Sequence, residues 1–178
     1  KTYSSSNSSL MVGFNRRYSP FTIKALDFFG EFNYPLMINY RINAGQLPAN
    51  HWFYDREVGG GRISSEVCHF IDYCNYFIKN KPIKLIAEVS NNVNSSIPNE
   101  DSVSLMIIYS DGSIANIFYS ADGSKIFPKE RIEIFGGEKT AVIDDFKSIS
   151  CFNKSKVKNK KIRTINKGQN NQIKLYIE

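Results

Sequence analysis

One short stretch of the chain concentrates side chains that could do acid–base chemistry. It offers an imidazole, a guanidinium, two carboxylates and hydroxyl groups at helical spacing: Arg62, Ser65, Glu66, His69, Asp72 and Tyr76. At roughly 100° per residue, these six side chains share one side of a helix. A side that simply faces solvent is usually rich in Lys and Glu, but this one has no lysine before Lys79. We therefore interpret it as the lining of a polar cleft.

His69 is the candidate for proton transfer on this side of the helix. The unperturbed pKa of histidine, about 6.5, suits a general acid or base near neutral pH. A neighbouring carboxylate, Glu66 or Asp72, could orient the imidazole ring. The alternative is that His69 is a structural or merely exposed side chain, which is the commoner role of a single histidine on a helix. The residue types alone leave both interpretations open.

The opposite side of the same stretch predicts a helix anchored on a core. Apolar residues recur there at steps of four, three and four, namely Val67, Ile71, Cys74 and Ile78. Three glycines at 59–61 precede the pattern and allow a sharp backbone turn, because glycine has no Cβ. We predict that the helix begins directly after these glycines and ends near Asn80.

Length and composition favour one globular domain. The chain has 178 residues, of which 42% are hydrophobic. We expect residues 1–9, which are polar and rich in serine, to be a disordered end segment, and residues 10–178 to form the domain. No apolar run approaches the roughly 20 residues that span a bilayer, so we expect no contact with a membrane.

The cysteines argue against both a disulfide framework and a metal site. Their number is three, which is odd, and two of them lie on one helix, so a cytoplasmic location is the default. A cluster of Cys68, His69, Asp72 and Cys74 is conceivable as a metal site. On a helix, however, Cys74 points away from the other three, and we expect no metal.

Positive charge is concentrated in one strip. The net charge of the chain is +6. The segment 146–168 contains eight basic residues and no acidic one. Nucleic acid could bind such a strip, but Phe152 is its only aromatic residue for stacking. Alternating lysines at 154–160 are also how an exposed edge strand resists aggregation. We favour the edge strand and expect no nucleic-acid partner.

The remaining elements predict an α+β fold. We expect a strand at 10–14, a helix from Pro20 to about Phe29 with Ser19 as its N-cap, and a strand at 35–44. An aromatic loop at 45–58 contains His51 and Trp52 and suits a binding lid. A series of strands follows at 84–90, 102–110, 113–120, 130–135, 140–144, 148–152 and 161–165, with a polar loop at 91–101 and a helix at 169–177. This order implies a mostly antiparallel sheet with helices packed on one face.

Several blocks of the sequence resemble one known family. They are Val-Gly-Phe-Asn-Arg-Arg-Tyr-Ser-Pro at 12–20, Tyr-Arg-Ile-Asn-Ala-Gly at 40–45, His-Trp at 51–52, Gly-Gly-Gly-Arg at 59–62, Glu-Val-Cys-His-Phe-Ile-Asp at 66–72, Ser-Asp-Gly-Ser at 110–113, Lys-Glu-Arg-Ile-Glu at 129–133 and Asp-Asp-Phe at 144–146. In this order they resemble the glucose-fructose oxidoreductase / inositol dehydrogenase / rhizopine catabolism (Gfo/Idh/MocA) family. The resemblance is strongest to the branch fused behind a zinc-alcohol-dehydrogenase-like half.

This resemblance implies the C-terminal, substrate-binding and oligomerisation domain of an NAD(P)-dependent oxidoreductase. The substrate would be a sugar, a cyclitol or a related hydroxy compound. His69 matches the family's catalytic histidine, and Arg16 would lie near the cofactor. The residues expected at the substrate are Asn43, Trp52, Arg62, Glu66 and Asp72.

The resemblance also implies what this chain lacks. The family's N-terminal Rossmann domain binds NAD or NADP, and no Gly-x-Gly-x-x-Gly that follows a strand and opens a helix occurs here. We therefore expect no cofactor on this chain alone, no activity without the Rossmann domain, and a homodimer formed through the open sheet face. Relatives often have aspartate where this chain has Ser65. The alternative is thus a non-catalytic oligomerisation module of the same fold.

Overall fold

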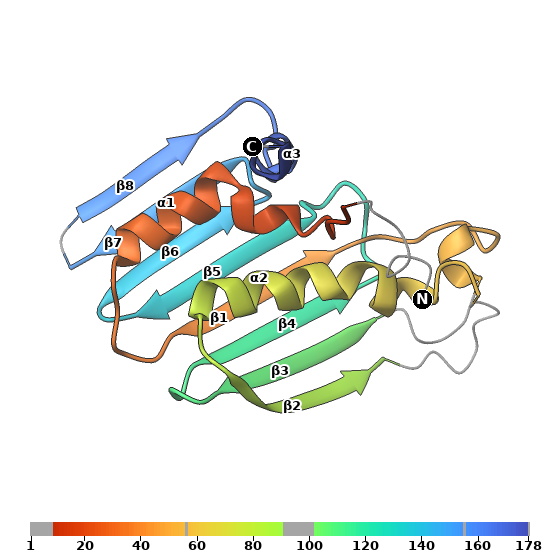
Figure 1. Ribbon diagram of the computed structural model, residues 1–178, viewed down its shortest axis with the longest axis horizontal. Helices are drawn as coiled ribbons and strands as arrows, with labels where there is room; N and C mark the ends of the chain where they lie inside the picture. Colours follow the sequence, from red (N-terminus) through yellow and green to blue (C-terminus); the bar gives the residue numbers. More distant parts are fainter. Residues whose placement is uncertain (1–8, 56, 91–101, 155, 178) are drawn as a thin grey trace.

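The computed structural model describes residues 9–55, 57–90, 102–154 and 156–177. Eight strands form a single sheet, and helices cover one of its faces (Figure 1). The predicted end segment at 1–9 falls outside the described residues except for its last one, and the predicted polar loop at 91–101 falls outside them entirely. The α+β class and the mostly antiparallel sheet are confirmed.

The strand order is β2-β3-β4-β1-β5-β6-β7-β8. Every neighbouring pair is antiparallel except β1 and β4, which run parallel. The first strand in the chain therefore lies at the centre of the sheet, between two hairpin-connected groups. The bounds are β1 (Met37–Asn43), β2 (Pro82–Val89), β3 (Val103–Tyr109), β4 (Ile114–Ser120), β5 (Glu130–Gly136), β6 (Lys139–Asp144), β7 (Ser148–Asn153) and β8 (Lys156–Lys161).

Two helices lie on the same face of the sheet. α1 (Pro20–Phe29) contacts β6 and β7, and its N-terminus is capped by the Ser19 hydroxyl, which accepts from the amide of Phe21. α2 (Cys68–Ile78) contacts β4 and crosses the centre of the sheet. Both helices were predicted from the sequence, and α1 has the predicted bounds.

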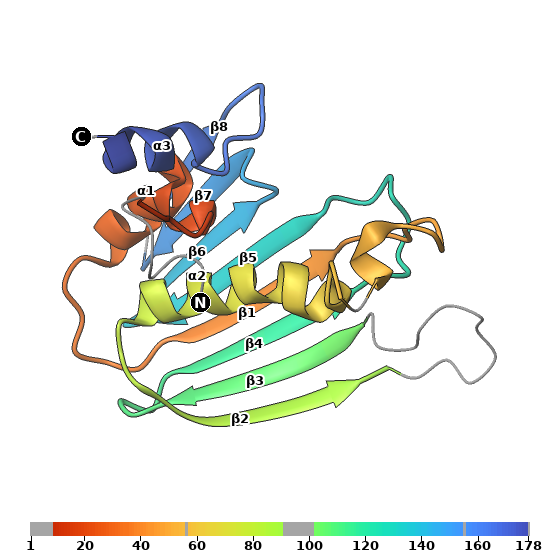
Figure 2. The same cartoon turned by 45° about the vertical axis from the view of Figure 1, so that its right-hand side comes forward.

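Shorter helical segments lead into these elements. η2 (Asn15–Tyr18) precedes α1, η3 (Trp52–Tyr54) lies in the aromatic loop, and a π-helical turn, η4 (Ile63–Val67), runs directly into α2. α3 (Gln169–Ile177) packs against η2 beyond α1 (Figure 2). In the part of the chain that the structure describes, no helix is long and apolar enough to cross a membrane.

The core lies between the helices and the inner sheet face. Alternate residues of β1, among them Ile38 and Tyr40, are buried there against α2 residues such as Phe70 and Tyr73. The alternate positions of the central strands point to the other face, which we call the open sheet face. It carries exposed apolar side chains: Met37, Ile86, Met106, Phe118 and Phe135.

Two strand predictions were wrong in position. No strand forms at 10–14, because tight turns bond the Phe14 amide to the Val12 carbonyl and leave Val12 60% exposed, without a neighbouring strand. The strand expected at 161–165 lies earlier, at β8, where it pairs with β7. The alternating lysines therefore do form the edge strand of the sheet, as the charge pattern predicted.

Candidate active site

The triple glycine turn sets the start of the helix that carries the candidate residues. Gly60 and Gly61 adopt positive φ values of 67° and 85°, a region that disfavours residues with a Cβ. A Cβ on Gly59 would lie 2.4 Å from the carbonyl oxygen of Trp52, so the turn packs tightly against η3. The Ser65 hydroxyl donates to the Gly59 carbonyl at 2.5 Å and so links the π-helical segment to the glycine turn.

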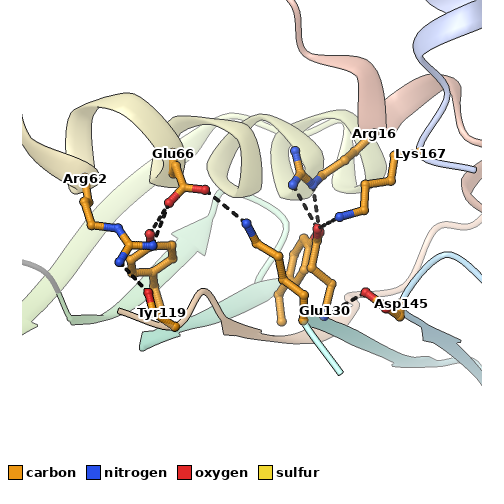
Figure 3. A network of polar contacts seen from close by, with 10 residues as sticks. Arg16, Arg62, Glu66, Tyr119, Glu130, Asp145 and Lys167 are labelled. Carbon is orange, nitrogen blue, oxygen red and sulfur yellow. Dashed lines mark hydrogen bonds and ion pairs between the residues drawn. The ribbon is translucent and has the colours of Figure 1, made fainter. Parts of the chain in front are cut away.

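Glu66 lies at the centre of one group of polar contacts beneath the helix (Figure 3). Its carboxylate accepts from the Arg62 guanidinium at 3.1 Å, from the Lys129 ammonium at 3.1 Å, and from the Tyr119 hydroxyl. Burial alone would raise the pKa of Glu66, but the hydrogen bonds from Tyr119 and Arg62 and the charge of Lys129 lower it below its ordinary value. Glu66 is therefore ionised at neutral pH.

Glu130, at the start of β5, is the centre of a second group (Figure 3). The Arg16 guanidinium donates two bonds to its carboxylate, at 2.7 and 2.9 Å, and Lys167 and Tyr40 each donate one at 2.5 Å. Burial opposes ionisation, yet Arg16 and Lys167 lower the pKa of Glu130 to about 2. We call Arg16, Arg62, Glu66, Lys129, Glu130 and Lys167 the polar network.

His69 lies on α2 three residues after Glu66, so the two side chains are neighbours on one helix face. The edge of the Phe14 ring packs against the imidazole, with ring centroids 5.4 Å apart. The imidazole Nδ1 is buried and has no hydrogen-bond partner among the described residues. Burial, followed by the charge of Arg16, lowers the pKa of His69, so the ring is neutral near pH 7 and able to accept a proton.

Two of the residues predicted at the substrate come from the chain segments beside this helix. Asn43, at the end of β1, is nearly buried, and its amide donates to the carbonyls of Ser124 at 2.7 Å and Phe127 at 3.2 Å. Trp52 lies in η3 with 55% of its surface exposed, stacked beside His51. Asn43 is thus fixed to the loop after β4, whereas Trp52 presents an open aromatic surface.

The charged residues predicted from the sequence are each paired with another chain segment. Arg62 is 1% exposed and also donates to the Gly45 carbonyl at 2.7 Å. Asp72 accepts two hydrogen bonds from Arg17, one of them from Nε at 3.0 Å. Arg16, predicted near a cofactor, is held by Glu130. The structure therefore brings Arg62 and Glu66 together, and places Asp72 and Arg16 in separate ion pairs.

A pocket of about 350 Å³ adjoins the polar network through Lys129. It lies where β1 ends and β5 begins, beside the loop that holds the Asn43 amide. Its lining consists of Asn43, Ala44, Lys125, Ile126, Phe127, Pro128, Lys129 and Asp145. This volume is in the range of small-molecule sites, about 300–1,000 Å³.

The site residues predicted from the sequence do not include Tyr40, Tyr119, Lys129, Glu130 or Lys167. The signal available for Glu130 was its place at the first position of an alternating strand, on the buried side, where a carboxylate needs partners. Its partners are 114 and 37 residues away in the sequence, so no local pattern joins them. Among the described residues, no cluster of three or more His, Cys, Asp or Glu could hold a metal ion.

Comparison with known families identifies the class of this domain. The model of the GFO/IDH/MocA C-terminal domain matches residues 29–142. That match covers more than half of the chain, which therefore belongs to this family of oxidoreductase domains. No curated protein sequence matches the chain closely enough to be counted as a relative.

Solved structures share the fold at low sequence identity. Aldose-aldose oxidoreductase from Caulobacter crescentus superposes with a TM-score of 0.70 at 16% identity, over 90% of this chain and 50% of that one. UDP-N-acetylglucosamine 3-dehydrogenase from Acidithiobacillus ferrooxidans gives 0.69 at 18% identity, over 94% and 53%. Levoglucosan dehydrogenase in complex with NADH gives 0.69 at 18% identity, over 93% and 50%. The chain thus spans about half the length of the structures that it matches.

Proposed function

We propose that this chain is the substrate-binding half of an NAD(P)-dependent oxidoreductase that acts on a sugar, a cyclitol or a related hydroxy compound. The observation that carries the proposal is the state of His69 in a domain of this family. Its imidazole is neutral near pH 7, its buried Nδ1 lacks a hydrogen-bond partner among the described residues, and it lies one helical turn from the ionised Glu66.

In this role His69 accepts the proton of the substrate hydroxyl as the alcohol becomes a carbonyl. The nicotinamide cofactor, when bound, supplies the acceptor for the hydride that leaves the same carbon. The lowered pKa of His69 suits a base that starts neutral. Glu66 is fixed by Arg62, Tyr119 and Lys129, so its charge stays in place beside the imidazole and stabilises the imidazolium that forms.

The cofactor, NAD or NADP, would be bound mainly by a Rossmann domain, which is not formed by the residues that the structure describes. The NADH in one similar structure and the half-length coverage support this division of labour. Fusion of this domain behind a zinc-alcohol-dehydrogenase-like half and a cytoplasmic location belong to the same proposal. Among the residues that the structure describes, Arg16 is the one predicted near the cofactor. The side chain of Arg16 is 10% exposed and bound to Glu130. Arg16 would therefore influence the cofactor through the positive charge that it contributes to the polar network.

The open sheet face is the proposed homodimer surface. Side chains such as Met37, Phe118 and Phe135 are 53%, 52% and 41% exposed and lie on adjacent strands of this face. Helices cover the other face, so the apolar residues of this face have no covering layer among the described residues. Burying them against a second copy of the same face would remove apolar area from water.

The test is the turnover of the full-length protein with NAD and with NADP after His69→Ala. Loss of a general base is expected to lower turnover about 10²- to 10⁴-fold. Cys68→Ala, at the adjacent and partly buried position on α2, is the matched control and should retain activity. Unchanged turnover in His69→Ala would show that the catalytic assignment is wrong.

A non-catalytic module of the same fold is the second candidate. The observation that favours it is Ser65, whose hydroxyl is engaged with the Gly59 carbonyl and is not directed to a ligand. Calorimetric titration of the full-length protein with NAD and NADP separates the two candidates. A structural relative need show no heat of binding, whereas the oxidoreductase binds at least one of the two cofactors.

A further inference from the structure

The charges around the pocket at the end of β1 are unevenly balanced. Lys125 and Lys129 both line it, and the only carboxylate in its lining is Asp145. One oxygen of Asp145 accepts the backbone amide of Glu130 at 3.3 Å. Behind the pocket wall, Glu130 is bonded by two cations, Arg16 and Lys167. Cations thus outnumber carboxylates in the lining, and in the adjoining polar network Arg16, Arg62 and Lys167 outnumber Glu66 and Glu130.

Lys129 is the cation of the polar network best placed to contact a ligand. Its side chain is 37% exposed, compared with 18% for Lys167 and 10% for Arg16. Its ammonium reaches Glu66 at 3.1 Å, but an ammonium has three donors and that bond uses one of them. The other donors are available for an acceptor inside the pocket.

Lys125 is an exposed residue whose aliphatic stem packs against the backbone of Gly45. A Cβ on Gly45 would lie 2.8 Å from its Cγ and 3.5 Å from its Cε, so the stem runs along a residue that has no side chain. Gly45 has a positive φ of 71°, which also favours glycine. The carbonyl of the same residue accepts from Arg62. The segment after β1 therefore places the stem of Lys125 beside the residue whose carbonyl accepts from Arg62.

We propose that the hydroxy compound bound at this site carries an anionic group, a carboxylate or a phosphate, held by the ammonium groups of Lys125 and Lys129. This inference rests on the proposed function, because it specifies the substrate class of the domain that carries His69. The pocket is connected to that helix through the bond of Lys129 to Glu66. The cations outnumber the carboxylates in the lining. Lys125 is exposed, but Lys129 is partly buried beside the polar network, where an anion gains more from a charged hydrogen bond than it does in bulk water. The pocket has room for a group of this size.

The experiment is calorimetric titration of the full-length protein with D-glucose, D-glucuronate, D-glucose 6-phosphate, acetate and inorganic phosphate. The neutral sugar is the reference, and the other four distinguish carboxylate from phosphate. We expect at least one anionic probe to bind about ten- to hundredfold more tightly than glucose. Lys125→Gln should remove most of that difference, and Lys129→Gln should do the same.

The matched control is Lys158→Gln, which removes an exposed lysine of β8 and should leave every affinity unchanged. The proposal is overturned if no anionic probe binds in a way that depends on Lys125. It is also overturned if saturating NAD abolishes the binding of the anion, because the site would then belong to the cofactor's pyrophosphate. These titrations need no turnover, so they can fail or succeed independently of the His69→Ala assay.

Discussion

Replacing Glu130 by glutamine should remove one of the main electrostatic supports of the fold. The side chain is 0% exposed, and its carboxylate receives four hydrogen bonds, three of them from the cations Arg16 and Lys167. Glu130→Gln keeps the shape of the side chain but leaves two cations without their counter-charge. Loss of one partner from a buried ion pair costs about 3–5 kcal/mol.

The pKa of the same group gives an independent magnitude. A carboxyl whose pKa falls from 4.5 to about 2 on folding contributes about 3 kcal/mol of stability at neutral pH. Because the folded pKa is the lower one, this contribution is complete above the unfolded value of 4.5 and is lost as the pH falls toward 2. The two routes agree on about 3–4 kcal/mol.

The assay is urea unfolding of the wild type and Glu130→Gln at a series of pH values. The difference in the free energy of unfolding should be about 3 kcal/mol at pH 7 and should shrink steadily below about pH 4.5. Glu138→Gln, at an exposed glutamate paired with an exposed lysine, is the matched control and should change little. A difference that is small at pH 7, or that does not change with pH, would refute the reasoning.

Three further predictions concern the helix turn, the imidazole and the open sheet face. Gly59→Ala should destabilise the fold by about 1–3 kcal/mol in urea unfolding, because the new Cβ would meet the Trp52 carbonyl at 2.4 Å. Nuclear magnetic resonance titration of His69 should give a pKa below 6.5, and turnover should fall as the pH drops through that value; a pKa above 6.5 would contradict the assignment of burial as its cause. Phe118→Glu should convert a dimer to a monomer in light scattering, and an unchanged mass would exclude the open sheet face as the interface.

Much of the secondary structure follows from local pattern. Ser19 and Pro20 mark the start of α1, and the apolar steps after Val67 mark the inner side of α2. Alternation predicted seven of the eight strands near their observed positions, and the lysine strip indicated the eighth as an edge. These features could be predicted because a cap, a helical period or an alternating strand involves residues close together in the sequence.

The candidate site was only partly predictable, because many of its contacts join residues that are far apart in the sequence. The sequence by itself determined that Arg62, Glu66 and His69 share one side of a helix, and the family blocks pointed to His69. Only the tertiary structure decided that β1 lies between β4 and β5, which brings Lys129 to Glu66 and Glu130 to its partners. The pKa of such groups depends on their burial and on the charged partners that contact them, and both depend on which distant segments pack together.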